Sequence, residues 1–217
     1  MAYRCVATSV AGFVQQLAVA YVANGYWFYV TGWVPDHKDP TTVDAKIIRQ
    51  YGIAITKWTR TRRKRGGQAN LQYLRYDRFF VIMATHGQHP FFAAEGKRIR
   101  DIRRKPVHFM GYAVGCRKGR DGRRWHPSVR LERGVFRELK ARFTHMALRR
   151  SVEDLCRELR ALDFGPYAPV RDQLRGLLRA VNHRRKTAGL ELLPHTTLRL
   201  RRRPVKPFGG EAPCAAC

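Results

Sequence analysis

The sequence predicts an α+β fold: a mostly antiparallel sheet of about five or six strands with one or two helices, followed by a C-terminal three-helix segment. The N-terminal half alternates aromatic and β-branched runs with Gly and Pro turns, as strands and hairpins do. One run, residues 79–84, is uncharged and wholly apolar, which is typical of a strand buried on both faces. From residue 134 the apolar spacing changes to that of helices.

The chain is expected to have three parts. Residues 1–132 form an α+β domain with basic hairpin loops. Residues 133–195 form a helical segment that either stands alone or shares one core with the first part. Residues 196–217 form a basic tail that is extended at first and then disordered.

The first predicted element is a helix over residues 7–23, where apolar residues follow helical spacing. Thr8 or Ser9 can cap its start, and Gly25 favours its end. Residues 26–34 are rich in aromatic and β-branched side chains and predict a strand.

A short helix comes next, with a capping box of Thr41 and Asp44 at its start and Gly52 at its end. Residues 53–58 and 69–76 are predicted strands, because both are rich in residues that favour extended backbone.

Two basic stretches are predicted to be exposed loops or hairpin tips. The first is residues 59–67, TRTRRKRGG, and the second is residues 117–127, RKGRDGRRWHP. The second stretch connects a predicted strand over residues 106–116 to a short one over residues 128–131. Gly in both stretches lets the backbone turn and lets a ligand approach closely.

Three helices are predicted after the sheet. They cover residues 135–146, residues 152–162 with Ser151 as N-cap, and residue 170 to near Gly189. A Gly/Pro break over residues 164–169 separates the second helix from the third.

The net charge of +27 and the isoelectric point near 11.1 indicate a polyanionic partner. Nucleic acid is the commonest such partner, either DNA or RNA. A codon bias toward Arg is an alternative explanation for the arginines, but it does not explain an excess of 43 basic over 16 acidic residues.

Three basic segments, residues 60–65, 117–124 and 199–203, and one face of a helix are predicted to contact nucleic acid. On the third helix, Arg171, Arg175, Arg179 and His183 recur every fourth residue and so form one stripe, unless the acids Glu153, Asp154 and Glu158 neutralise it. The residues expected to bind nucleic acid are Arg60, Arg62, Arg63, Lys64, Arg65, Arg117, Lys118, Arg120, Arg123, Arg124, Trp125, Arg171, Arg175, Arg179, Arg201, Arg202 and Arg203.

Two tryptophans, Trp58 and Trp125, flank the basic segments. Aromatic side chains beside Arg can stack on the bases of a single strand. The alternative is that both are core residues at the mouths of loops, since Trp is usually largely buried.

His86 and His89 follow the most buried predicted strand and form a candidate catalytic or divalent-metal site. The pair is similar in composition to the His pair of HUH-type endonucleases, a resemblance that implies a metal-dependent nuclease with Tyr167 as nucleophile. Here Gly and Gln separate the histidines, where that family has one hydrophobic residue, and Tyr167 lacks a Lys four residues on. The alternative is that both are turn or surface histidines.

A membrane location is not expected. Residues 5–35 carry no charged side chain, but Gln15, Gln16 and Asn24 interrupt the apolar run. The five scattered cysteines and the lack of a signal peptide of the usual form favour a reducing compartment, so the predicted location is cytoplasmic, or nucleoid-associated if the partner is DNA.

Three functions remain open on the sequence. The first is a nucleic-acid-binding protein, with a mobile element or replication system as its setting. The second is a metal-dependent nuclease or strand-transfer enzyme that uses His86 and His89. The third is a structural component of a ribonucleoprotein.

Overall fold

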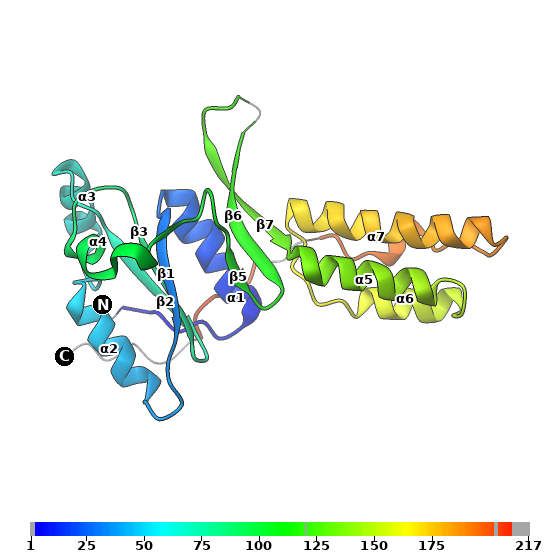
Figure 1. Ribbon diagram of the computed structural model, residues 1–217, viewed down its shortest axis with the longest axis horizontal. Helices are drawn as coiled ribbons and strands as arrows, with labels where there is room; N and C mark the ends of the chain where they lie inside the picture. Colours follow the sequence, from blue (N-terminus) through cyan, green and yellow to red (C-terminus); the bar gives the residue numbers. More distant parts are fainter. Residues whose placement is uncertain (1–2, 120, 202–203, 210–217) are drawn as a thin grey trace. The chain divides into compact units, whose positions relative to one another are not determined.

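The computed structural model describes residues 3–119, 121–201 and 204–209. The predicted α+β class is confirmed, with two antiparallel sheets and the helices α1 to α7 (Figure 1). The strands divide between a four-stranded and a three-stranded sheet, whereas the sequence suggested one sheet of five or six strands. The chain divides into two compact units. Unit 1 comprises Met1–Val107, Val114–Pro127 and Pro204–Cys217, and unit 2 comprises His108–Ala113 and Ser128–Arg203.

The four-stranded sheet of unit 1 has the order β2-β3-β1-β4. Its strands are β1 Phe28–Trp33, β2 Leu71–Tyr76, β3 Phe79–Ala84 and β4 Arg100–Asp101. Strand β3 is antiparallel to both neighbours, so Ile82 lies opposite Val30 of β1 and opposite Tyr73 of β2. Because β3 is central and covered on both faces, it needs the continuous apolar run that predicted it.

One face of this sheet is covered by the N-terminal helix. Helix α1, Val10–Gln15, continues through a π-helical segment, Gln16–Tyr21, and a 3-10 turn, Val22–Asn24. The hydroxyl of Ser9 accepts a hydrogen bond from the backbone N–H of Gly12 at 3.0 Å, which confirms the predicted cap. Gly25 ends the helix at φ 87°, a conformation that glycine adopts without strain.

The other face carries an apolar cluster beneath α2 (Pro40–Gln50) and α4 (Pro90–Glu95). The members that are fully buried come from both sheet and helices, and include Val30, Ile48, Leu71, Tyr73, Ile82 and Phe91. The predicted capping box of α2 is wrong. Asp39 caps the helix by accepting from the N–H of Thr42 at 2.8 Å, and Asp44 points into the protein.

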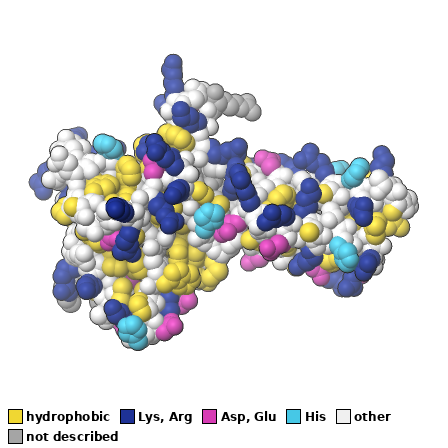
Figure 2. All heavy atoms as spheres, viewed as in Figure 1, with side chains coloured by type: hydrophobic (Ala, Val, Ile, Leu, Met, Phe, Trp, Pro, Cys, Tyr) yellow, Lys and Arg dark blue, Asp and Glu magenta, His cyan; other side chains and the backbone are white. Residues whose placement is uncertain are grey.

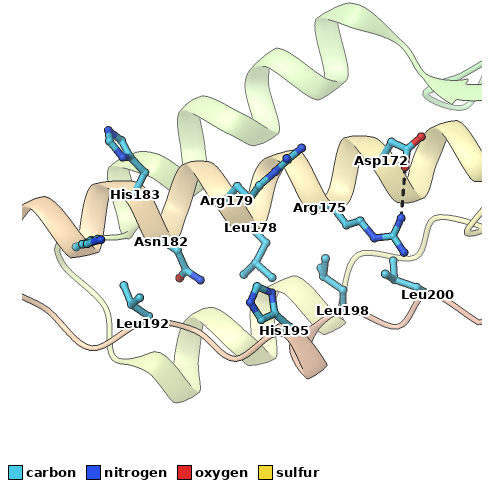
Figure 3. Close-up of a pocket in the computed structure, with 11 residues that line it drawn as sticks. Asp172, Arg175, Leu178, Arg179, Asn182, His183, Leu192, His195, Leu198 and Leu200 are labelled. Carbon is cyan, nitrogen blue, oxygen red and sulfur yellow. Dashed lines mark hydrogen bonds and ion pairs between the residues drawn. The ribbon is translucent and has the colours of Figure 1, made fainter.

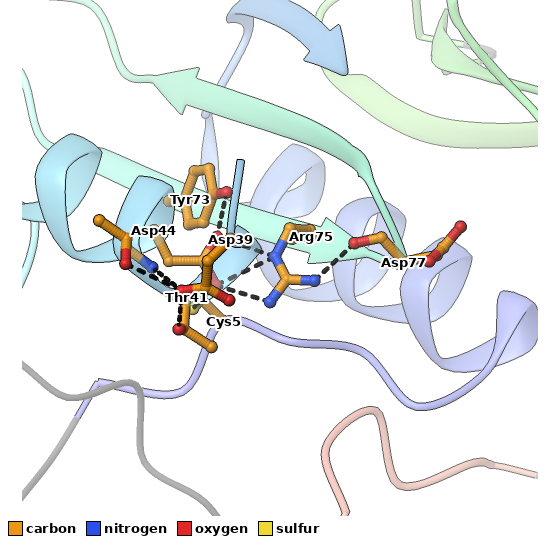
Figure 4. A network of polar contacts seen from close by, with 8 residues as sticks. Cys5, Asp39, Thr41, Asp44, Tyr73, Arg75 and Asp77 are labelled. Atoms are coloured by element: carbon orange, nitrogen blue, oxygen red, sulfur yellow. Dashed lines mark hydrogen bonds and ion pairs between the residues drawn. The ribbon is translucent and has the colours of Figure 1, made fainter. Parts of the chain in front are cut away.

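Asp44 forms a buried ion pair with Arg75 of β2 (Figure 4). Its Oδ1 accepts from Nε of Arg75 at 2.8 Å, and its Oδ2 accepts from Nη2 at 2.8 Å. The hydroxyl of Tyr73 also donates to Oδ1, so three neighbouring groups satisfy one carboxylate. Burial, followed by the nearby carboxylate, raises the pKa of Tyr73 well above its ordinary value and keeps the phenol protonated as a donor.

The helix α3, Lys57–Arg65, replaces two predicted elements. Both the strand over residues 53–58 and the loop over residues 59–67 are wrong. The hydroxyl of Thr56 accepts from the N–H of Thr59 at 3.2 Å and caps the helix, and Arg and Lys are good helix formers. The basic residues and the two glycines of this stretch predict a loop, but Gly66 and Gly67 follow the helix and the basic residues form it.

The three-stranded sheet has the order β5-β6-β7, with β5 Val107–Phe109, β6 Tyr112–Lys118 and β7 Trp125–Leu131. The predicted single strand over residues 106–116 is therefore two strands. Met110 and Gly111 both have positive φ, 45° and 79°, and form the turn between them. The predicted hairpin loop between β6 and β7 is present, and it projects from unit 1 (Figure 1).

Unit 2 contains the three helices predicted from the apolar period: α5 Arg133–Met146, α6 Val152–Arg160 and α7 Ala168–Thr187. Ser151 caps α6, as predicted. Arg185 of α7 is buried, and its Nη1 donates to the carbonyl oxygens of Ala147 and Arg150 at 2.8 and 3.0 Å. This guanidinium fixes the end of α5 against α7.

Removal of the buried carboxylate is expected to be the costliest single polar change in unit 1. Asp44→Ala leaves Arg75 buried without its partner, so the free energy of unfolding should fall by about 3–5 kcal/mol, measured by urea denaturation. Asp36→Ala is the control, because Asp36 pairs with Arg78 through a carboxylate that is 98% exposed. Equal stability of the two variants would contradict a structural role for the Asp44–Arg75 pair.

The Asp39 cap predicts a pH dependence. Hydrogen bonds from the Thr41 hydroxyl and from Thr42 lower the pKa of Asp39 from 3.8 to about 2. A lowered folded-state pKa gives stability that is complete above about pH 4 and is lost as the pH falls toward 2. Asn also caps helices, but it does not titrate. Asp39→Asn should therefore lose less stability than the parent protein as the pH falls from about 4 to 2. Urea denaturation at a series of pH values measures this difference. An unchanged pH profile would argue against the cap.

Candidate nucleic-acid interface

Helix α3 presents the most exposed large aromatic side chain of the described chain, Trp58, which is 83% exposed. Arg62 and Arg65 follow at four and seven residues along the helix, so both lie on the face of Trp58. All three line a shallow hollow of about 380 Å³ together with Thr59 and Thr61. This face combines an apolar ring with two cations and carries no acid.

Two of the predicted contact residues on α3 hydrogen-bond to backbone carbonyl groups within the protein. Arg60 donates from Nη1 to the carbonyl oxygen of Leu71 and from Nη2 to that of Ile53, both at 2.9 Å. Arg63 donates from Nη1 to the carbonyl oxygen of Gly52 at 3.4 Å. These bonds fasten α3 to the sheet, and they leave Arg62, Lys64 and Arg65 directed to solvent.

The β6–β7 hairpin carries four further predicted residues, all exposed: Arg117, Lys118, Arg123 and Arg124. Within the described ranges none of their side chains forms an ion pair, and Asp121 of the same hairpin accepts from the backbone N–H of Arg123 at 3.1 Å. The predicted contact Arg120 lies outside the residues that the structure describes. The hairpin therefore presents cations that a phosphate backbone can neutralise.

Trp125 sits at the base of this hairpin and is only partly exposed. The guanidinium of Arg103 lies 4.4 Å from the ring centre of Trp27 and 5.9 Å from that of Trp125, and Lys118 lies 5.7 Å from the latter. Asp101 fixes the same guanidinium through a bidentate ion pair at 2.7–3.1 Å. Trp125 thus anchors the hairpin, and of the two predicted stacking residues only Trp58 is open.

The Arg103 stack was missed on the sequence, because Trp27, Arg103 and Trp125 are far apart along the chain. Arg103 also affects the pKa of Asp101. Partial burial raises this pKa, but the hydrogen bonds from Arg103 lower it by more, so the pKa of Asp101 lies below its ordinary value. Asp101 therefore remains a carboxylate that orients Arg103.

In unit 2 the predicted stripe of α7 borders a groove of about 880 Å³ (Figure 3). Its basic side is formed by Arg175, Arg179 and Lys186 of α7, beside the imidazoles of His183 and of His195 from the following segment. Its apolar side is formed by Leu178, Leu192, Leu198 and Leu200. The groove can hold an anionic ligand that also has an apolar part.

The acids of α6 do not neutralise this stripe. Glu158 pairs with Arg142 at 3.1 Å, and Asp154 pairs with Arg157 of its own helix. Within unit 2, Asp172 is the acid that reaches the stripe, at 3.4 Å from Arg175. Over the described residues, Arg171 and Arg179 keep their charge without an acidic partner.

The basic tail is only partly described. Arg201 is exposed, whereas the predicted contacts Arg202 and Arg203 lie outside the described residues. Nearer the end, the carbonyl oxygen of Pro207 accepts from the N–H of Thr8 at 3.1 Å, so this part of the tail lies along unit 1. Figure 2 shows Lys and Arg side chains spread over the visible surface, with fewer acids among them.

His86 and His89 lie at the end of β3 but have different surroundings. His89 is the N-cap of α4, where its Nδ1 accepts from the N–H of Phe91 at 3.1 Å. Burial, with a smaller effect of Arg63, lowers the pKa of His89 and favours the neutral imidazole that capping requires. His86 is exposed, and its ring lies 6.4 Å from that of Phe28.

The third ligand that a metal site would need is not found near the pair. Glu95 accepts from the hydroxyl of Tyr51, and His108 pairs with Glu132 in unit 2 at 3.3 Å. Asp77 lies in the β2–β3 turn, about 20 Å away along the six residues of β3. Among the residues described, no three His, Cys, Asp or Glu side chains form a cluster suited to a metal ion. Tyr167, the predicted nucleophile, precedes α7 in unit 2.

Comparison of the chain with protein-family models, with curated proteins and with solved structures found no match in any of the three. Within the ranges that the structure describes, no helix has the length and apolar character needed to cross a membrane. The function is therefore inferred from residue geometry.

The cap at His89 predicts that the two histidines behave differently when each is replaced. His89→Ala should lower the free energy of unfolding by about 1 kcal/mol, because it removes the side-chain acceptor for the N–H of Phe91, whereas His86→Ala should leave it unchanged. Urea denaturation, carried out once with Mn²⁺ and once with a chelator, measures the change in unfolding free energy for each variant. Equal losses that appear only when Mn²⁺ is present would support a shared metal site instead.

Proposed function

We propose that this protein binds nucleic acid by holding the phosphate backbone with basic side chains of α3, of the β6–β7 hairpin and of α7. The observation that carries this proposal is that, in the described parts of the chain, no acid pairs with the side chains of Arg62, Arg65, Arg123, Arg124, Arg171 and Arg179. Acids elsewhere pair with particular arginines, such as Arg75, Arg103 and Arg142, and Asp172 pairs with Arg175. The six unpaired arginines are left for an external anion.

The number and spread of these cations favour a polymer over a small anion. Arg62 and Arg65 lie on α3, Arg123 and Arg124 lie near the end of the hairpin, and further arginines lie along the whole length of α7. A polyanion neutralises many such sites at once and releases its own counterions, so binding gains free energy from each contact. The self-repulsion that accompanies a net charge of +27 is relieved in the same step.

The proposal predicts binding that weakens steeply with salt. Fluorescence anisotropy of labelled DNA and RNA, across a salt series, should give a linear fall of the logarithm of the binding constant with the logarithm of salt concentration. The double variant Arg62→Ala with Arg65→Ala should reduce that slope by about 2, since each lost phosphate contact removes about 1. Arg123→Ala with Arg124→Ala should do the same.

A matched control is Arg98→Ala with Arg157→Ala. This variant removes the same charge from two exposed arginines that pair with Glu95 and Asp154. Its slope should stay close to that of the parent, because those arginines are neutralised within the protein. Equal loss in the control, or equal affinity for polyglutamate, would contradict a dedicated nucleic-acid interface.

A further inference from the structure

Trp58 contributes little to the fold, although Trp side chains are usually largely buried. Of the four tryptophans, Trp27 and Trp125 contact Arg103, and Trp33 packs edge-on against Phe79 with ring centres 5.3 Å apart. In the described chain, Trp58 has no ring or cation stacked on it, and 83% of its surface is exposed. Trp is enriched at binding interfaces, because its large ring supplies apolar contact area and its N–H a polar handle.

The helix that carries Trp58 is rigidly held. Thr56 caps its start, and Arg60 ties it to two backbone carbonyl groups. The side-chain amide of Asn70 donates to the carbonyl oxygen of Arg60 at 2.9 Å. A ligand that binds to this face pays little entropy for ordering α3, because the protein has already fixed it.

The face around Trp58 determines what it can bind. Arg62 and Arg65 continue the same face over about 10 Å of helix, and the helix contains Lys57 and Lys64 but no acid. An anionic chain with flat apolar rings matches this pattern of one ring followed by cations. Single-stranded nucleic acid has that chemistry, since its bases are unpaired and its phosphates are regularly spaced.

We propose that α3 binds single-stranded nucleic acid, with an unpaired base stacked on the indole of Trp58 and neighbouring phosphates on Arg62 and Arg65. This inference rests on the proposed function and adds the strandedness of the ligand. In a duplex both faces of each internal base are covered by its neighbours, so the indole has no surface to stack on. Arg62 and Arg65 can contact phosphates of either form.

The test compares Trp58→Leu with the parent protein on a labelled oligothymidine and on a duplex of equal length. Trp58→Leu should weaken binding to the single strand roughly 5- to 150-fold, the range for loss of one stacked base, and should leave duplex binding unchanged. Trp58→Phe keeps a smaller ring and should recover part of the loss. Trp33→Leu is the matched control, because it removes an indole that is also exposed, at 64%, from β1.

Tryptophan fluorescence gives an independent readout. Stacking of thymine on an indole quenches its emission, so oligothymidine should quench the parent protein more than it quenches Trp58→Phe. The thermal unfolding midpoint of Trp58→Leu should equal that of the parent, because the side chain packs against little.

The outcomes separate this inference from the proposed function. If Trp58→Leu binds the single strand as well as the parent does, while Arg62→Ala with Arg65→Ala binds it less well, base stacking is wrong and nucleic-acid binding stands. If Trp58→Leu loses single-strand and duplex binding equally, the proposed preference of α3 for single-stranded nucleic acid is wrong. If the parent binds neither nucleic acid in a salt-dependent manner, both proposals fail.

Discussion

The buried ion pair between Asp44 and Arg75 is the constraint on which unit 1 depends. It joins α2 to β2 through three charge-assisted hydrogen bonds, and the hydroxyl of Tyr73 donates a further hydrogen bond to the same carboxylate. Two charges in a core cost desolvation free energy, so such a pair is retained only where its geometry is satisfied. Because one end is on a helix and the other on a strand, the pair fixes how α2 lies over the sheet.

A second constraint is that many arginines of this basic protein are used internally. Arg185 satisfies the carbonyl groups at the end of α5, Arg60 satisfies two carbonyl groups beneath α3, and Arg103 stacks between two tryptophans. The long side chain and the planar head of Arg suit such bridges better than Lys does. The cations left at the surface, such as Arg62 and Arg65, are therefore fewer than the composition suggests.

The spacing of apolar residues predicted the helices and strands that bury one face, and it failed for elements without a buried face. The apolar run of β3, the cap at Ser9 and the three helices of unit 2 followed from local spacing. Helix α3 has no buried residue of its own, so its Arg-rich sequence gave no periodic signal. The turn at Met110 was missed because a non-glycine residue adopts positive φ there, which local propensity does not anticipate.

The sequence by itself determined the α+β class, the central strand and the excess of positive charge, because composition and apolar period are properties of neighbouring residues. Only the tertiary structure decided which cations are free and which tryptophan is open. Arg60 and Arg62 are two residues apart on one helix, yet the first bonds to the sheet and the second faces water. That difference depends on contacts with residues distant in sequence, as it does for Trp58 and Trp125, so no local pattern encodes it.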